Sequence, residues 1–291
     1  MISLGVNSVL FKAFSFAEAA RAIALAGYDG VEISAIQGMC EHLVLDDYKS
    51  QKAELLSVME ETGLKFLSTE VASLDRERLK KAFEAAAELG IPVVVAVNMM
   101  DIVRKSGDKI HIDELGIPVV NVGPGGKSDV PEDLEESLNT LYDRAELAKE
   151  YGVTLCCKAH VGSAVYNTPT TLKMMEKVAL DSFGVDMDPS HIYRAGERPE
   201  QALPAVISRV KHIHIRDCKG PGPAPGVPAL QACGRGDIDL MGYFKAMADA
   251  RYQGPVCLEV IGPDLTMTEA AVVAAESYGY MNACLKALGA R

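Results

Sequence analysis

Several common features are absent from this chain, and each absence excludes a class of protein. Its 7 cysteines are scattered and form no CxxC pair, which excludes a zinc ribbon and a thioredoxin-type redox motif. No uninterrupted apolar run is long enough to span a bilayer. The first residues lack the basic and apolar segments of a signal peptide. We therefore expect a cytoplasmic protein with reduced thiols and no membrane partner.

Basic residues are also scarce relative to acidic ones. The chain has 29 Lys and Arg against 40 Asp and Glu, a formal net charge of −11. Because nucleic-acid binding depends largely on Lys and Arg neutralising phosphates, we expect no nucleic-acid partner. The hydrophobic fraction of 48% is normal for a well-packed globular protein, and 291 residues suit one large barrel or two ordinary domains.

Short β-rich runs alternate with helical segments along the whole chain, and no stretch resembles an interdomain linker. About eight strand–helix units match the count and length of a single (β/α)8 TIM barrel, predicted here as one domain over residues 1–291. A doubly wound open sheet is the alternative, but no GxGxxG follows the first predicted strand. The predicted strands are 2–6, 30–34, 65–70, 91–98, 153–159, 183–188, 210–217 and 256–261. The predicted helices are 16–26, 48–61, 76–89, 132–151, 169–178, 199–208, 240–251 and 266–288.

Three of the predicted strands end in side chains that bind divalent metals, namely Asp188, His214 and Glu259. Charged and imidazole groups are costly to bury unless they are paired or ligated. Because the carboxyl ends of barrel strands meet at one face, these groups predict a shared metal site. Taken singly, Asp188 before a proline could form a turn, and His214 could be a core histidine with His212 as a competitor for its role.

Five short motifs follow one another in a specific order and spacing. They are GYDGVE at 27–32, DPSH at 188–191, HIHIRD at 212–217, GRGDID at 234–239 and GPVCLE at 254–259. Together they resemble the xylose isomerase-like barrels, the sugar phosphate isomerase/epimerase-type proteins that share ancestry with endonuclease IV. The resemblance spans nearly the whole chain. It implies a sugar substrate, a homo-oligomer and one divalent ion, manganese first and magnesium, cobalt or zinc as alternatives.

Family members of the ketose 3-epimerase type bind their ion through Glu, Asp, His and Glu at the ends of strands five to eight. The resemblance assigns the last three ligands to Asp188, His214 and Glu259. It also assigns His191 to a histidine that contacts substrate, or a second metal in the endonuclease branch.

The end of strand five departs from the family pattern. Where the family has Glu, usually as Glu-x-His, this chain has Cys156-Cys-Lys158-Ala-His160. Lys158 could supply the charge of a metal, donate a proton or form a Schiff base, given a depressed pKa. His160 could be the fourth ligand or the base. The remaining alternative is a site that has lost both metal and activity.

Five further residues are predicted to contact the substrate, three of them its hydroxyl groups and Arg216 a carboxylate or phosphate. Glu32, Glu70 and Asn98 end predicted strands two, three and four, and Arg216 and Asp217 end strand seven. For the two glutamates the simpler alternative is an ion pair with a neighbouring Lys or Arg.

A metal beside a general base suits proton abstraction next to a carbonyl, through an enediolate. We therefore predict a metal-dependent isomerase or epimerase of a ketose or related sugar, phosphorylated or not. Glu259 or His160 would move the proton, and His191 and Lys158 would orient substrate oxygens. The alternatives are a metal-dependent lyase acting on a keto-inositol or 3-keto-glycoside, an endonuclease-like hydrolase, and a non-catalytic homologue.

Overall fold

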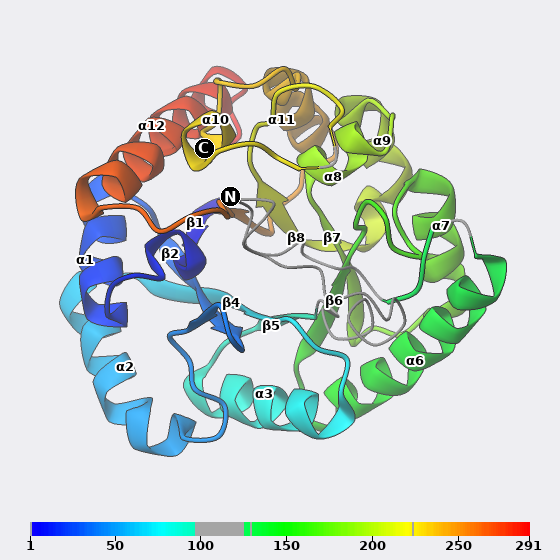
Figure 1. The fold of residues 1–291 in the computed structure, drawn as a ribbon, viewed down its shortest axis with the longest axis horizontal. Helices are drawn as coiled ribbons and strands as arrows, with labels where there is room; N and C mark the ends of the chain where they lie inside the picture. The colour runs from blue at the N-terminus through cyan, green and yellow to red at the C-terminus, as the bar shows by residue number, and fades with distance from the viewer. Residues whose placement is uncertain (1, 97–124, 129, 223) are drawn as a thin grey trace.

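The computed structural model describes residues 2–96, 125–128, 130–222 and 224–291. Its strands form a closed barrel surrounded by helices (Figure 1). The sheet order is β1-β9-β8-β7-β6-β5-β4-β2-β3, and the additional pairing of β1 with β2 closes the barrel. All pairings are parallel except that of β2 with β3. The predicted (β/α)8 TIM barrel is therefore confirmed.

The described strands match the predicted ones in order and position, with one addition. The short antiparallel strand β3 pairs with the end of β2 and was not expected from the sequence. The strands are β1 (Ser3–Asn7), β2 (Gly30–Ile36), β3 (Cys40–Glu41), β4 (Lys65–Val71), β5 (Val93–Ala96), β6 (Thr154–Lys158), β7 (Phe183–Met187), β8 (Val210–Ile215) and β9 (Pro255–Leu258).

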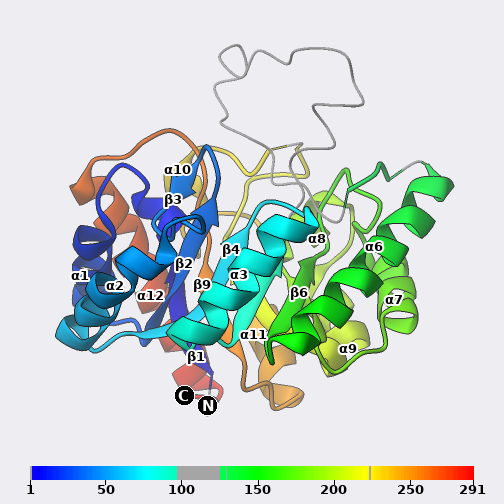
Figure 2. The ribbon, with the colours of Figure 1, turned by 90° about the horizontal axis from the view of Figure 1, so that it is seen from below.

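The described helices lie outside the strands, as the side view shows (Figure 2). None of them is long and apolar enough to cross a membrane. Short helices after β1, β7, α9 and β8 add to the predicted set. The helices are η1 (Ser8–Phe11), α1 (Phe16–Ala26), α2 (Tyr48–Thr62), α3 (Arg76–Leu89), α6 (Pro131–Glu150), α7 (Thr168–Lys177), α8 (Pro189–Arg194), α9 (Pro199–Val206), η2 (Ile207–Arg209), α10 (Pro228–Gln231), α11 (Leu240–Asp249) and α12 (Met267–Ala287).

Local signals in the sequence fix where several helices begin and end. A capping box starts α12, with Thr266 and Glu269 each binding the other's backbone N–H. Gly63 and Gly90 directly follow α2 and α3 and adopt φ values of 70° and 71°. Glycine reaches this left-handed region without a steric penalty, so both helices stop there.

The interior of the barrel changes from tightly packed to polar along its axis. At the amino-terminal end β1 and β2 approach closely, and Gly5 pairs with Gly30 in register. A Cβ on Gly30 would lie 2.3 Å from the carbonyl oxygen of Lys65 and 2.7 Å from a Leu67 carbon. At the carboxyl-terminal end, buried charged side chains replace the apolar ones. This end corresponds to the face where barrel enzymes have their active sites.

Close packing of β2 against β4 predicts that Gly30→Ala destabilises the protein. We expect a loss of about 1–3 kcal/mol in the free energy of unfolding, because the neighbouring backbone carbonyl cannot move aside easily. Urea denaturation followed by circular dichroism measures this loss. Gly279→Ala is the control, because a Cβ there meets nothing within 4 Å in helix α12. Its stability should be unchanged or rise by up to about 1 kcal/mol. Equal stability of the two variants would contradict the packing argument.

Candidate active site

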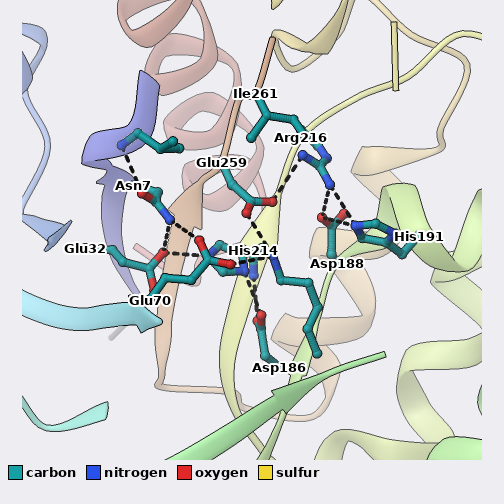
Figure 3. A network of polar contacts seen from close by, with 12 residues as sticks. Asn7, Glu32, Glu70, Asp186, Asp188, His191, His214, Arg216, Glu259 and Ile261 are labelled. Atoms are coloured by element: carbon teal, nitrogen blue, oxygen red, sulfur yellow. Dashed lines mark hydrogen bonds and ion pairs between the residues drawn. The ribbon is translucent and has the colours of Figure 1, made fainter. Parts of the chain in front are cut away.

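Charged and polar side chains from several strands meet inside the carboxyl-terminal half of the barrel (Figure 3). Each of them is at most 1% exposed. Burial of so many ionisable groups is costly unless each charge has a partner. The members of this polar cluster are Asn7, Glu32, Glu70, Lys158, Asp186, Asp188, His191, His212, His214, Arg216 and Glu259.

Lys158 is the last residue of β6 and lies at the centre of the cluster. Its Nζ is 2.9 Å from Oε1 of Glu259 and 3.2 Å from Oε1 of Glu70. Burial opposes the charged form, but the carboxylates of Glu259 and Glu70 outweigh it and raise the pKa of Lys158. The ammonium therefore stays charged. A Schiff base would need a depressed pKa, so this geometry removes the support for that alternative.

Arg216 follows β8 and joins two carboxylates on neighbouring strands. Its Nη1 lies 3.1 Å from Oε2 of Glu259, and its Nη2 lies 3.0 Å from Oδ2 of Asp188. Its Nε donates to Oγ of Ser190 at 2.8 Å. Figure 3 shows the guanidinium between Glu259, Asp188 and His191. The two oxygens of Glu259 thus face two different cations, Lys158 and Arg216.

The two carboxyl groups on Lys158 have opposite pKa shifts. Burial is the main cause that raises the pKa of Glu70 to about 8, and the nearby charge of Glu259 adds to it. For Glu259, burial is outweighed by Lys158 and Arg216, and its pKa is lowered. Near neutral pH, Glu70 is therefore largely protonated while Glu259 is ionised. A protonated carboxyl group can donate a proton and an ionised one can accept a proton, so such a pair offers both functions in one site.

Asn7 and His214 fix the carboxyl groups on the first strands. Nδ2 of Asn7 donates to Oε2 of Glu70 at 2.6 Å and to Oε2 of Glu32 at 3.0 Å. Nε2 of His214 lies 2.5 Å from the same oxygen of Glu32. Its Nδ1 lies 2.6 Å from Oδ2 of Asp186, so both ring nitrogens have a carboxylate partner. Burial opposes a charged imidazole, yet these carboxylates raise the pKa of His214 well above its usual value.

Asp186 is a site residue that the sequence interpretation missed. Its Oδ1 accepts from the backbone N–H of His214 at 3.0 Å and lies 3.0 Å from Nδ1 of His212. Nε2 of His212 in turn pairs with Oγ of Ser68 at 2.8 Å. The available signal was spacing, because Asp186 lies two residues before Asp188 and so faces the same side of its strand.

The rings of His160 and His191 are in contact at the barrel mouth, with their centroids 3.9 Å apart and their planes tilted by 38°. His191 lies between two guanidinium groups, with Nη2 of Arg194 and Nη2 of Arg216 each 2.8 Å from one of its ring nitrogens. Nδ1 of His160 is 2.9 Å from the carbonyl oxygen of Val161. Its buried Nε2 has no hydrogen-bond partner among the described residues. Burial lowers the pKa of both imidazoles well below the usual value, so both are neutral.

The structure does not bring the three predicted metal ligands around one point. His214 is turned towards Glu32 and Asp186, whereas Asp188 and Glu259 are bridged by Arg216. Other groups of potential ligand atoms do lie within 4.8 Å of one another, but none contains Asp188 or Glu259. Among the described residues these groups are Glu32 with His212 and Cys257, Asp186 with His212 and His214, and Glu32 with Glu70 and His214.

The residues predicted to contact substrate do not all lie in the polar cluster. Glu32, Glu70, His191 and Arg216 belong to the polar cluster, whereas Asn98 lies outside the described residues. Asp217 points away from the cluster and anchors the following loop. Its carboxylate accepts from the backbone N–H groups of Cys218 at 2.9 Å, Gly234 at 3.0 Å and Ile238 at 3.2 Å.

Comparison with known sequences finds one family model and several relatives that match this chain. A family model described as xylose isomerase-like TIM barrel matches residues 20–284. Inosose dehydratase of Clostridium perfringens is 30% identical over 140 residues, 43% of this chain and 46% of the relative. The chain thus spans about half the length of this relative. Inosose dehydratase of Clostridium botulinum (strain Alaska E43) is 25% identical over 273 residues, which are 86% of this chain and 83% of the relative.

Solved structures with the same fold include a dehydratase, an epimerase and a zinc-bound protein. The probable 3-DHS dehydratase AsbF of Bacillus anthracis superposes with a TM-score of 0.72, at 14% identity over 97% of this chain and 99% of that one. D-allulose 3-epimerase of Methylomonas sp. gives 0.69, at 17% identity over 98% of both chains. The IolI protein with a bound zinc atom gives 0.70, at 19% identity over 98% of this chain and 99% of that one. A divalent ion thus occurs in a barrel of this fold.

The position of Lys158 between two buried carboxyl groups predicts that Lys158→Met is strongly destabilising. We expect a loss of about 3–5 kcal/mol, because removal of one partner leaves an uncompensated buried charge. The loss should be largest near neutral pH and should shrink as pH falls below about 4, the unfolded-state pKa of a glutamate. In the wild type, Lys158 and Arg216 hold the folded-state pKa of Glu259 below its unfolded value, and the stability given by its ionised form disappears on protonation.

Urea denaturation at several pH values measures this effect. Lys245→Met is the control, because Lys245 pairs with Asp249 on an exposed helix surface. Exposed pairs contribute about 0–1 kcal/mol, so this variant should differ little from the parent protein at any pH. A Lys158→Met protein as stable as the control at pH 8 would show that the central ion pairs do not hold the cluster together.

Proposed function

Because the chain belongs to the xylose isomerase-like TIM barrel family, we propose that it is an enzyme acting on a polyhydroxylated ketone. It removes the proton next to the carbonyl and then expels water, as a lyase would. Dehydration rather than epimerisation is favoured by the inosose dehydratase of Clostridium botulinum, which aligns with 86% of this chain. The substrate class is a small cyclic ketose or keto-inositol with hydroxyl groups on the carbons beside the carbonyl.

The observation that carries this proposal is the pair of carboxyl groups on Lys158. Elimination of water needs a group that accepts the α-proton and another that protonates the departing hydroxyl. The protonated Glu70 supplies the acid near neutral pH and the neutral His160 supplies the acceptor, while the ionised Glu259 holds the two cations of the site. The C–H bond breaks to form an enolate, the β C–O bond then breaks, and the hydroxyl leaves as water. No oxidant or reductant is consumed.

The residues of the cluster have distinct roles in this reaction. His160 accepts the α-proton, since its imidazole is neutral and its buried Nε2 has no partner among the described residues. Lys158 and Arg216 stabilise the enolate oxygen as preorganised cations. Glu259 positions both cations, and the protonated Glu70 donates its proton to the leaving hydroxyl. His191 orients a substrate hydroxyl at the mouth of the barrel.

Epimerisation is the second candidate, and one observation favours it. D-allulose 3-epimerase of Methylomonas sp. has the same fold, and two carboxyl groups held by one lysine could exchange a proton with a single carbon. The same enolate then takes back its proton on the opposite face instead of losing water. Both reactions share the first step, so variants that block it should stop either one.

The test uses keto-inositols and ketoses in deuterated water, followed by NMR. Dehydration predicts consumption of substrate with loss of one hydroxyl, whereas epimerisation predicts deuterium at one carbon with every hydroxyl retained. We expect His160→Gln to lower kcat/KM by about 10²–10⁴-fold, the typical contribution of an acid–base group. Glu259→Gln should lower it by about 10²–10³-fold, because Lys158 and Arg216 lose the carboxylate that positions them for the enolate oxygen.

Glu276→Gln is the control, since Glu276 pairs with Arg235 on the surface and should leave turnover unchanged. Wild-type rates in either active-site variant would contradict the proposed roles. An absence of solvent exchange with every ketone in the panel would contradict the proposed chemistry itself.

A further inference from the structure

We propose that Lys158 and Arg216 replace the divalent ion that the resemblance to ketose 3-epimerase-type barrels implies at Asp188, His214 and Glu259. Two side-chain cations then supply the positive charge of the site, and the chain binds no ion at these ligands. The proposal rests on contacts of the chain itself and not on the reaction proposed above.

The carboxylate oxygens that an ion would need already face side-chain cations at ion-pair distance. Oε1 of Glu259 faces the ammonium of Lys158 at 2.9 Å, and its Oε2 faces the guanidinium of Arg216 at 3.1 Å. Oδ2 of Asp188 faces the same guanidinium at 3.0 Å, and its Oδ1 accepts from the backbone N–H of Ser190 at 2.8 Å. An incoming ion would have to displace one of these cations and then lie beside the other.

The imidazole of His214 is also not oriented to bind an ion together with Asp188 and Glu259. A histidine ligand must offer one ring nitrogen with a free lone pair to the metal. Both ring nitrogens of His214 are within 2.6 Å of a carboxylate oxygen, one from Asp186 and one from Glu32. The side chain therefore belongs to a carboxylate–imidazole clamp and not to a shared point with Asp188 and Glu259.

The two cations that take the place of the ion suit the carboxylates that they face. A guanidinium stays charged at every pH at which the protein is folded, and its planar fork suits two carboxylates at once. Arg216 uses its two terminal nitrogens in this way, on Glu259 and Asp188. Lys158 lies at the end of β6, where the resemblance places the first carboxylate ligand. At this position the chain therefore has a positive charge where the family has a metal-binding carboxylate.

The remaining candidate ligand groups do not restore the predicted site. In the group of Glu32, Glu70 and His214, Nδ2 of Asn7 already bridges the two carboxyl groups, at 3.0 and 2.6 Å. Removal of Asn7 would be needed before an ion could take that position. Binding at such a group is an outcome that the experiment below separates by mutation.

The first experiment measures metal binding to the wild-type chain after treatment with a chelator. Elemental mass spectrometry and titration calorimetry with Mn²⁺, Co²⁺, Zn²⁺ and Mg²⁺ should detect no stoichiometric ion. Added ions should not raise Tm, because only a ligand that binds the folded state stabilises it. One equivalent of ion per chain, lost in both Asp188→Asn and Glu259→Gln, would overturn the proposal.

The second experiment tests whether the lysine excludes the ion. Lys158→Glu removes the ammonium and adds the carboxylate that the resemblance expects, so we predict at least about 100-fold tighter binding of Mn²⁺ or Zn²⁺ than in the wild type, with a rise in Tm. Lys245→Glu makes the same charge change on the exposed surface and should show no gain. If Lys158→Glu folds only when an ion is added, recovery of folded protein gives the same answer.

Failure of Lys158→Glu to bind an ion any better than Lys245→Glu would show that the ammonium is not what excludes it, and would overturn the proposal. Metal content and Tm are the readouts, and neither depends on turnover. A negative result in the ketone assay would therefore refute the proposed function without affecting this inference.

Discussion

A chain of alternating acidic and basic side chains across the barrel is the interaction on which the rest of the site depends. It runs from Glu70 to Lys158, then to Glu259, Arg216 and Asp188, each within 3.2 Å of the next. Every member is fully buried, so none can rely on water for its solvation. Loss of one member would leave its neighbours with uncompensated charges. This mutual dependence holds side chains from five different strands in a single arrangement.

The strand period explains how the sequence builds this arrangement. Side chains two residues apart lie on the same face of a strand, so the segment HIHIRD directs His212, His214 and Arg216 inward at successive levels. The deepest histidine binds Asp186 and Ser68, the next binds Asp186 and Glu32, and the arginine reaches Glu259 and Asp188. Polarity thus increases towards the carboxyl end, where the charges face the mouth.

The fold was predictable from the sequence because its signals are local. Alternating strand and helix patterns, Gly63, Gly90 and the Thr266 capping box each act over a few residues and need no knowledge of distant contacts. The identity of the cluster was also largely predictable, since ionisable residues at strand ends stand out. The pairing of the side chains within the cluster was not predictable from the sequence. Whether Arg216 or a metal neutralises Glu259 depends on side-chain directions from two strands, and no local pattern in either segment encodes that choice.

The contrast between an ion and two side chains has a physical consequence for catalysis. A bound ion brings two charges to one point, whereas Lys158 and Arg216 spread the same charge over both sides of Glu259. Charges fixed to the backbone are preorganised and need no reorganisation as negative charge develops on a substrate oxygen. Their fixed position also restricts where that oxygen can lie. A site that carries its own cations in this way does not depend on a bound ion, and it accepts only substrates whose carbonyl oxygen can reach those cations.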